Sequence, residues 1–244
     1  MAFAAILVSL MLAGCVTTET TVSVDPQFVA MYGPAQNEPF HVSAVKVSKI
    51  ESQYLRQTVA TPATISEPVG TIVVDPYSKF LYLVQEGGHS LRYGIGVGRQ
   101  GFSWAGEATI QEKRPWPKWF PPQEMQERDQ LAAKFPNGMD GGPQNPLGSR
   151  ALYLFEGNCN GNNARTQSCK DTLYRLHGTT EPESIGRAVS SGCIRLFQQD
   201  IIDLYDRVPL GTRVVVLQGP AGPALLPALS DTLAPVTATG ASGV

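Results

Sequence analysis

The chain has 244 residues, 42% of them hydrophobic, which is enough to build one sizeable domain or two small ones. Its formal net charge of −2 at pH 7 gives no basic excess, so nucleic acid is not an expected partner. The 24 glycines and 19 prolines, with few helical patterns, favour strands and loops.

The first residues have the pattern of an export signal. Met1–Gly14 is apolar and uncharged, too short to span a membrane but of the length of a signal-peptide apolar region. A buried strand or helix is the alternative. Leu12-Ala13-Gly14-Cys15 resembles the lipobox of bacterial lipoproteins, although the usual preceding Lys or Arg is missing. The resemblance implies that residues 1–15 form a lipoprotein signal segment and that a lipid on Cys15 binds a bilayer. Val16, in place of Asp, favours the outer membrane over the inner one.

Two stretches around a central domain lack clear periodicity. Residues 16–66 are rich in Thr, Val, Ser and Pro and are predicted to be a tether, with one short ordered piece around Val42–Tyr54. Residues 219–244 are rich in Pro, Ala, Thr and Gly and are predicted to be a disordered tail. One domain is expected between them, over residues 67–218.

Within this domain, short apolar runs separated by turn residues predict strands. The predicted strands are Gly70–Asp75, Phe80–Val84, Leu91–Val97, Ala151–Phe155, Thr172–Leu176 and Arg213–Leu217. One helix is predicted from the apolar spacing of Ile201, Leu204, Tyr205 and Val208, and Pro209 and Gly211 end it. We therefore expect a mainly-β, sandwich-like domain with one short helix after Cys193.

The cysteines divide into three groups. Cys15 is assigned to lipid, and Cys159 and Cys169 are close in sequence around a polar, turn-rich loop. In an oxidising compartment this pair is expected to form a disulfide. Two unpaired thiols or a zinc pair are the alternatives, and the zinc pair lacks a nearby His or second cysteine pair. Cys193 is left over, and a leftover thiol in an exported protein requires an explanation.

Cys193 has the surroundings of a nucleophile. The preceding small residues, Ser190, Ser191 and Gly192, permit a tight turn that exposes the sulfur. The amides of Gly192 and Cys193 can then point at an oxyanion. Arg195, two residues later, favours the thiolate and could bind a carboxylate.

His177 is the candidate base, at the end of a predicted strand. Gly178 after it allows close backbone approach, and a carbonyl there could orient the imidazole. His41 lies in the predicted tether and His89 in a hairpin turn, so both are weaker candidates. Taken alone, the residues leave an alternative open, in which the cysteine is a buried apolar residue and the histidine a structural one.

The run from His177-Gly178-Thr179 to Ser190-Ser191-Gly192-Cys193-Ile194-Arg195 resembles the signature of the L,D-transpeptidase (YkuD-type) catalytic domain family. Similar upstream segments extend the resemblance to about Val69–Leu217: Gly98–Gly106, Lys113–Pro122 and Asn145–Leu152. Ser191 stands where the family often has His, which leaves His177 as the sole base.

The resemblance implies a chemistry that needs no cofactor or metal. Cys193 attacks the L,D-peptide bond of a peptidoglycan tetrapeptide stem, D-Ala leaves, and a thioester remains. An amine of another stem gives a 3→3 cross-link, and an amine of an outer-membrane protein gives an anchored protein. Water as acceptor would make an L,D-carboxypeptidase. A catalytically dead, lipid-anchored wall-binding module is the alternative from another class. The expected site of action is the periplasm, with Arg195, Ser190 and Ser191 contacting substrate.

The Trp116-Pro117-Lys118-Trp119 segment allows two interpretations. The two rings could line a groove for glycan or stem peptide, or they could cover the edge of the sandwich. The Gly/Pro-rich loops Gly138–Gly142 and Gln144–Gly148 come just before a predicted strand and are expected to shape the cleft.

Overall fold

The computed structural model describes residues 24–98, 104–159, 168–190 and 192–222. Its α-helices are α1 (Pro26–Met31), α2 (Gln123–Gln126), α3 (Gln130–Lys134) and α4 (Gln198–Arg207). Its strands are β1 (Gln57–Ala60), β2 (Ile72–Asp75), β3 (Phe80–Val84), β4 (His89–Gly94), β5 (Val97–Gly98), β6 (Gly106–Pro115), β7 (Arg150–Gly157), β8 (Cys169–Gly178), β9 (Ala188–Ser190), β10 (Ile194–Leu196) and β11 (Arg213–Val216). Short 3-10 turns cover Val47–Lys49, Ser52–Tyr54, Glu86–Gly88 and Pro182–Ser184.

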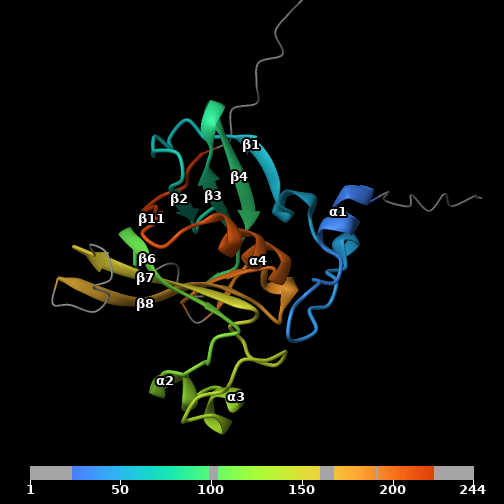
Figure 1. Ribbon diagram of the computed structural model, residues 1–244, viewed down its shortest axis with the longest axis vertical. Coiled ribbons are helices and arrows are strands. Elements are labelled where there is room, and N and C mark those ends of the chain that lie inside the picture. The colour runs from blue at the N-terminus through green and yellow to red at the C-terminus, as the bar shows by residue number, and fades with distance from the viewer. Residues whose placement is uncertain (1–23, 99–103, 160–167, 191, 223–244) are drawn as a thin grey trace, which may run out of the picture.

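Within the described residues, one nine-stranded sheet runs in the order β1-β4-β3-β2-β11-β6-β7-β8-β10, and β5 pairs with β9 in a second, small sheet. The pairs β11–β2 and β10–β8 are parallel, and the other pairs of the large sheet are antiparallel. In Figure 1, α4 lies between the strands β2, β3 and β4 and the strands β6, β7 and β8.

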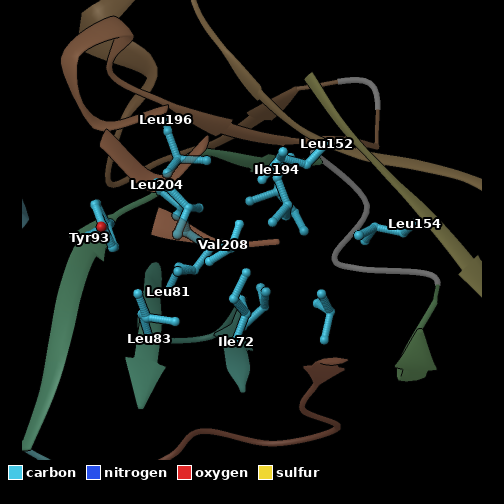
Figure 2. Packing of buried hydrophobic residues seen from close by; sticks show 14 of the residues in the cluster. Ile72, Leu81, Leu83, Tyr93, Leu152, Leu154, Ile194, Leu196, Leu204 and Val208 are labelled. Carbon is cyan, nitrogen blue, oxygen red and sulfur yellow. The ribbon is translucent and has the colours of Figure 1, made fainter. Parts of the chain in front are cut away.

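The main core joins the two ends of this sheet through α4. Leu81 and Tyr93 from one end, Leu152 and Ile194 from the other, and Leu204 of α4 belong to one buried cluster. In Figure 2, Leu204 of α4 lies between the side chains that come from the two ends of the sheet. The sheet therefore packs on itself around a helix, and the predicted mainly-β, sandwich-like class is confirmed.

The local predictions for the domain agree well with the elements. Phe80–Val84 is a strand with the predicted bounds, and the predicted helix is α4, with Ile201 and Leu204 fully buried. The strand β6 lacks a sequence prediction because its residues are mostly polar, and only Ala108 and Ile110 point into the core. The short helices α1, α2 and α3 were also not predicted from the sequence. None of the described helices is long and apolar enough to cross a membrane.

The tether predicted for residues 16–66 does not describe the chain from residue 24 onward. Tyr32, Val47 and Leu55 are buried in a cluster with Ile185 and Phe197. The segment ends in β1, an edge strand of the large sheet. Its apolar residues lack regular spacing, so their burial depends on a surface made by residues far along the chain. The domain boundary at residue 66 itself stays a prediction.

Polar contacts fix the same segment to the domain. The hydroxyl of Tyr32 donates to both carboxylate oxygens of Asp200, at 3.0 and 2.9 Å, and Arg56 pairs with Asp203 at 2.8 Å. Glu38 accepts from the guanidinium of Arg150 with Oε2 at 2.9 Å and pairs with it through Oε1 at 2.5 Å. These contacts are largely shielded from water, so the N-terminal segment from residue 24 is part of the folded unit.

Three predictions fall on residues outside the described ranges. These are the signal segment with Cys15, Ser191 together with the side chain of Ser190, and the tail beyond residue 222. Of the predicted tail, Gly219–Gly222 is described, and the amide of Ala221 donates to Asp75 Oδ2 at 2.8 Å.

Candidate active site

The imidazole of His177 is held near the end of β8. The side chain is 4% exposed, and its Nδ1 lies 2.6 Å from the carbonyl oxygen of Gly178. Because a carbonyl can only accept, Nδ1 carries the proton, and Nε2 of the neutral ring keeps its lone pair. The carbonyl after the histidine thus orients the ring, as the sequence suggested.

Burial and charge keep this ring neutral. Burial lowers the pKa of His177 to about 4, hydrogen bonds to the backbone of Gly178 and Leu147 oppose the shift, and the cations Arg195 and Arg175 add to it. At neutral pH the imidazole is therefore unprotonated, which is the form that a base requires.

Cys193 lies just before β10 and keeps its thiol. The thiol is half-buried, and its Sγ lies 4.0 Å from the carbonyl oxygen of Leu173 on β8. Burial raises the pKa of Cys193, while a backbone hydrogen bond at Arg175 and the charges of Arg175 and Arg195 lower it. The resting thiol is neutral, and it needs a base to become a nucleophile.

The sheet places the two groups on neighbouring strands. In the parallel pair of β8 and β10, Ile194 lies opposite Leu176, and Arg195 lies opposite His177. Cys193 directly precedes Ile194, so it enters the ladder beside the strand that carries His177. Residues that are sixteen positions apart in the chain thereby share one edge of the sheet.

Gly192 has the backbone conformation that the turn requires. Its φ of 137° is in the region that side chains rarely adopt, and it leads directly into Cys193. Ser190 ends β9, where it pairs with Gly98 of β5. The predicted roles of Ser190 and Ser191 in substrate binding remain predictions.

Arg195 is fixed by its backbone and by one ion pair. Its amide donates to the carbonyl of Gly96 at 2.8 Å, and its carbonyl accepts from the Gly96 amide at 2.9 Å. Its guanidinium contacts Glu181 at 2.7 Å. The arginine side chain is 17% exposed and the glutamate 58%, so the cation is the fixed member of the pair.

Gln198, which the sequence analysis missed, supports the backbone after His177. Its Oε1 accepts from the Ser149 amide at 2.9 Å, and its Nε2 donates to the Thr179 carbonyl at 3.0 Å. A Cβ on Gly178 would lie 2.4 Å from the same Oε1. Gly178 therefore leaves room for the hydrogen-bonded amide of Gln198, and only the folded chain brings the two together.

A second arginine, Arg175, also lay outside the sequence prediction. It is two residues before His177 on β8, pairs with Asp171 through two hydrogen bonds at 2.7 and 2.8 Å, and stacks over the ring of Tyr153 at 4.3 Å. The usual alternation of a strand could have suggested that Arg175 and His177 share a face.

The cysteine pair forms the expected disulfide. Cys159 and Cys169 are joined, with their Cα atoms 4.8 Å apart. Cys169 begins β8 opposite Gly157 at the end of β7, so the bond closes the end of this hairpin. Among the described residues, no group of His, Cys, Asp and Glu is arranged to hold a metal ion.

The long loop between β6 and β7 borders the site. Buried Asn145 donates to the carbonyls of Pro117, Met139 and Asp140 at 2.9–3.2 Å, which ties the two arms of the loop together. Trp119 is buried, as the covering interpretation requires, whereas Trp116 is half-buried.

Comparisons with known proteins identify the family of the chain. A family model described as YkuD, L,D-transpeptidase catalytic domain, matches residues 70–216. The "Probable L,D-transpeptidase ErfK/SrfK" of Escherichia coli K12 is 30% identical over 203 residues, 79% of this chain and 59% of the relative. The "Probable L,D-transpeptidase YbiS" of the same strain is 31% identical over 170 residues, 67% of this chain and 49% of the relative.

The chain thus spans about half to three fifths of the length of these curated relatives. Among solved structures, a protein from Brucella melitensis described as a "Probable carnitine operon oxidoreductase caia" is 49% identical. The match covers 70% of this chain and 99% of the other, with a TM-score of 0.44.

Proposed function

Because this chain belongs to the YkuD family of L,D-transpeptidase catalytic domains, we propose that it transfers an acyl group from a peptidoglycan stem peptide through a thioester on Cys193. The observation that carries the proposal is the buried imidazole of His177, held neutral on the strand that pairs with the strand following Cys193.

The reaction begins with a proton transfer. Nε2 of His177 takes the proton of the Cys193 thiol as the sulfur attacks the carbonyl carbon of the L,D-peptide bond. The carbonyl oxygen becomes an oxyanion, for which the amides of Gly192 and Cys193 are the proposed donors. The imidazolium then returns its proton to the leaving nitrogen, the C–N bond breaks, and D-Ala departs.

The second half-reaction reverses these roles. An amine attacks the thioester carbonyl, His177 takes its proton, and the C–S bond breaks to restore the Cys193 thiol. A stem amine gives a 3→3 cross-link, an amine of an outer-membrane protein gives an anchored protein, and water gives an L,D-carboxypeptidase. We place the reaction in the periplasm, with lipidated Cys15 holding the chain at the outer membrane.

Arg195 is the proposed carboxylate-binding residue. Its ion pair with Glu181 is exposed on the glutamate side, and exposed ion pairs contribute little to stability. A substrate carboxylate can therefore replace Glu181 with little loss of free energy, while the backbone of Arg195 stays fixed between Gly96 and β8.

The test incubates the purified, reduced chain with disaccharide-tetrapeptide muropeptides and resolves the products by mass. We expect D-Ala release, with cross-linked dimers or tripeptides according to the acceptor. Cys193→Ala should abolish product, and His177→Ala should lower the rate by about 10²–10⁴-fold.

Each outcome has a defined meaning. Tripeptide without dimer in the presence of a stem amine acceptor identifies a carboxypeptidase. Muropeptide binding without any product by a folded chain with a titratable Cys193 thiol identifies a catalytically dead binding module. Undiminished D-Ala release by Cys193→Ala contradicts the assignment of the nucleophile.

A further inference from the structure

A cavity of about 240 Å³ lies where the N-terminal segment meets the domain. Its lining comes from three parts of the chain: residues 41–45, Trp116 and Pro143 of the β6–β7 loop, and Thr179, Thr180 and Pro182 with residues 197–199. Thr179 follows the His177-Gly178 pair directly. The cavity is therefore next to the catalytic strand but is built partly from a segment outside the residues that match the family.

The lining indicates a small, uncharged ligand. None of the residues that line the cavity is Asp, Glu, Lys or Arg. Its volume is below the range of about 300–1,000 Å³ that is usual for drug-sized ligands, so a single ring is the size that fits. Five of the lining residues are exposed and form its mouth: His41, Ser43, Ala44, Pro143 and Thr180.

The indole of Trp116 is held in place from outside the cavity. Its Nε1 donates to Glu38 Oε2 at 2.8 Å, and the Phe40 ring packs edge-on against it with centroids 4.9 Å apart. Glu38 is itself fixed by Arg150. A ring that is preorganised in this way offers an apolar surface to a ligand without a further loss of side-chain entropy.

Polar groups of the lining complement this surface. Gln199 is 8% exposed, and its Nε2 donates to the carbonyls of Gly33 and Ser43 at 2.8 and 3.0 Å. Its Oε1 is buried without a hydrogen-bond partner among the described residues. This acceptor is closed to solvent, so a ligand in the cavity would meet the exposed polar residues His41, Ser43 and Thr180 instead.

We propose that this cavity binds one neutral, hydroxyl-rich sugar ring of the wall glycan, with the ring face against Trp116. The face of an aromatic ring, together with uncharged hydrogen-bond donors and acceptors, suits a pyranose that carries hydroxyl and N-acetyl groups. The inference rests on the proposed function for the identity of the polymer, since the sugar and the stem peptide are parts of one substrate. The N-terminal segment thereby contributes to substrate selection.

The test measures binding of tri-N-acetylchitotriose, a saccharide without a stem peptide, by calorimetry. Wild type should bind it saturably, and Trp116→Ala should weaken binding at least about tenfold, as expected for loss of an aromatic contact. Ala44→Phe, which fills the mouth and removes no hydrogen bond, should do the same. Ala133→Phe, at an exposed alanine of α3 outside the cavity, is the matched control and should bind like wild type.

A second readout separates this proposal from the proposed function. Ala44→Phe should raise KM for a disaccharide-tetrapeptide about tenfold but leave D-Ala release from a free tetrapeptide unchanged. No saccharide binding by wild type, or equal binding by wild type and Ala44→Phe, overturns the sugar site. If wild type binds the saccharide but releases no D-Ala from the free tetrapeptide, the acyl-transfer function is overturned and the sugar site is not.

Discussion

His177 and Arg195 occupy opposite positions in the parallel ladder between β8 and β10. Burial disfavours the imidazolium, and the positive charge of Arg195 acts in the same direction. The same cation favours the thiolate of Cys193, although burial outweighs it. One arginine thus biases both groups, and the resting pair is a neutral thiol and a neutral imidazole.

The first prediction concerns the protonation state of this pair. Alkylation of Cys193 by iodoacetamide, followed by intact mass, should rise with pH in one step above the pKa of an ordinary cysteine. No step is expected near pH 6.5, because the ring of His177 is neutral down to about pH 4. An acid step followed by a plateau of fast alkylation would show a thiolate–imidazolium pair instead. Cys193→Ala identifies label at other sites.

Replacement of Gly178 tests its contact with Gln198. A Cβ at this position would displace Oε1 of Gln198 and break its hydrogen bonds to Ser149 and Thr179. We expect Gly178→Ala to lower the free energy of unfolding by about 1–3 kcal/mol, measured in urea.

In a Gln198→Ala background the same change should cost less than half as much, because only the 3.2 Å approach to Ile201 Cγ2 remains. Gly142→Ala, where no atom lies within 4 Å of the added Cβ, is the control and should have little effect. Equal costs in both backgrounds would argue against the contact.

Glu38→Gln tests the docking of the N-terminal segment. The variant leaves the largely buried guanidinium of Arg150 without its carboxylate, so urea unfolding should show a loss of about 1–3 kcal/mol. Burial raises the pKa of Glu38, but hydrogen bonds from Arg150 and Trp116 and the charge of Arg150 outweigh it, and the net shift is downward. The contribution is therefore present above pH 4.5 and lost as pH falls through the folded-state pKa.

Glu124→Gln, at an exposed position of α2, is the control for this change. If both variants unfold at the same urea concentration as wild type, the segment does not contribute to stability through Glu38.

Asp200 should give stability an unusual dependence on pH. Burial raises its pKa from 3.8 to about 7, while Arg56 and the Tyr32 hydroxyl lower it and Asp203 raises it. Between these two pKa values the folded state binds a proton that the unfolded state lacks, so this contribution falls as pH rises from about 4 to about 7.

Asp200→Asn carries no titrating proton and should lack that dependence. The unfolding free energy of wild type minus that of the variant, measured at pH 4.5, 6 and 7.5, should therefore decrease as pH rises. A constant or increasing difference contradicts the raised pKa.

The disulfide should stabilise the β7–β8 hairpin. It closes a loop between residues ten positions apart, for which the chain-entropy model gives about 2–3 kcal/mol. Thermal unfolding of Cys159→Ser/Cys169→Ser should show this loss, and a reductant should lower the stability of wild type but not of the double variant. Equal stability of wild type with and without reductant would exclude a stabilising role.

Much of the chemistry could be read from local sequence. The spacing from His177 to Cys193, with Gly192 before the thiol, carried a family resemblance that the family match confirms. A short apolar run bounded by turn residues predicted β3, and one apolar stripe predicted α4, because both patterns depend only on which residues of an element are buried.

The remaining features depend on residues that the sequence keeps far apart. Tyr32 meets Asp200 across 168 positions, Gln198 reaches the backbone around Gly178, and Trp116 is held by Glu38. Periodicity reports a residue's own face and not its partner, so no local pattern marks these contacts. The sequence alone determined the nucleophile and base as candidates. Only the tertiary structure decided that residues 24–60 join the folded unit and that Arg195 pairs with His177 in the ladder, because both follow from strand order and packing.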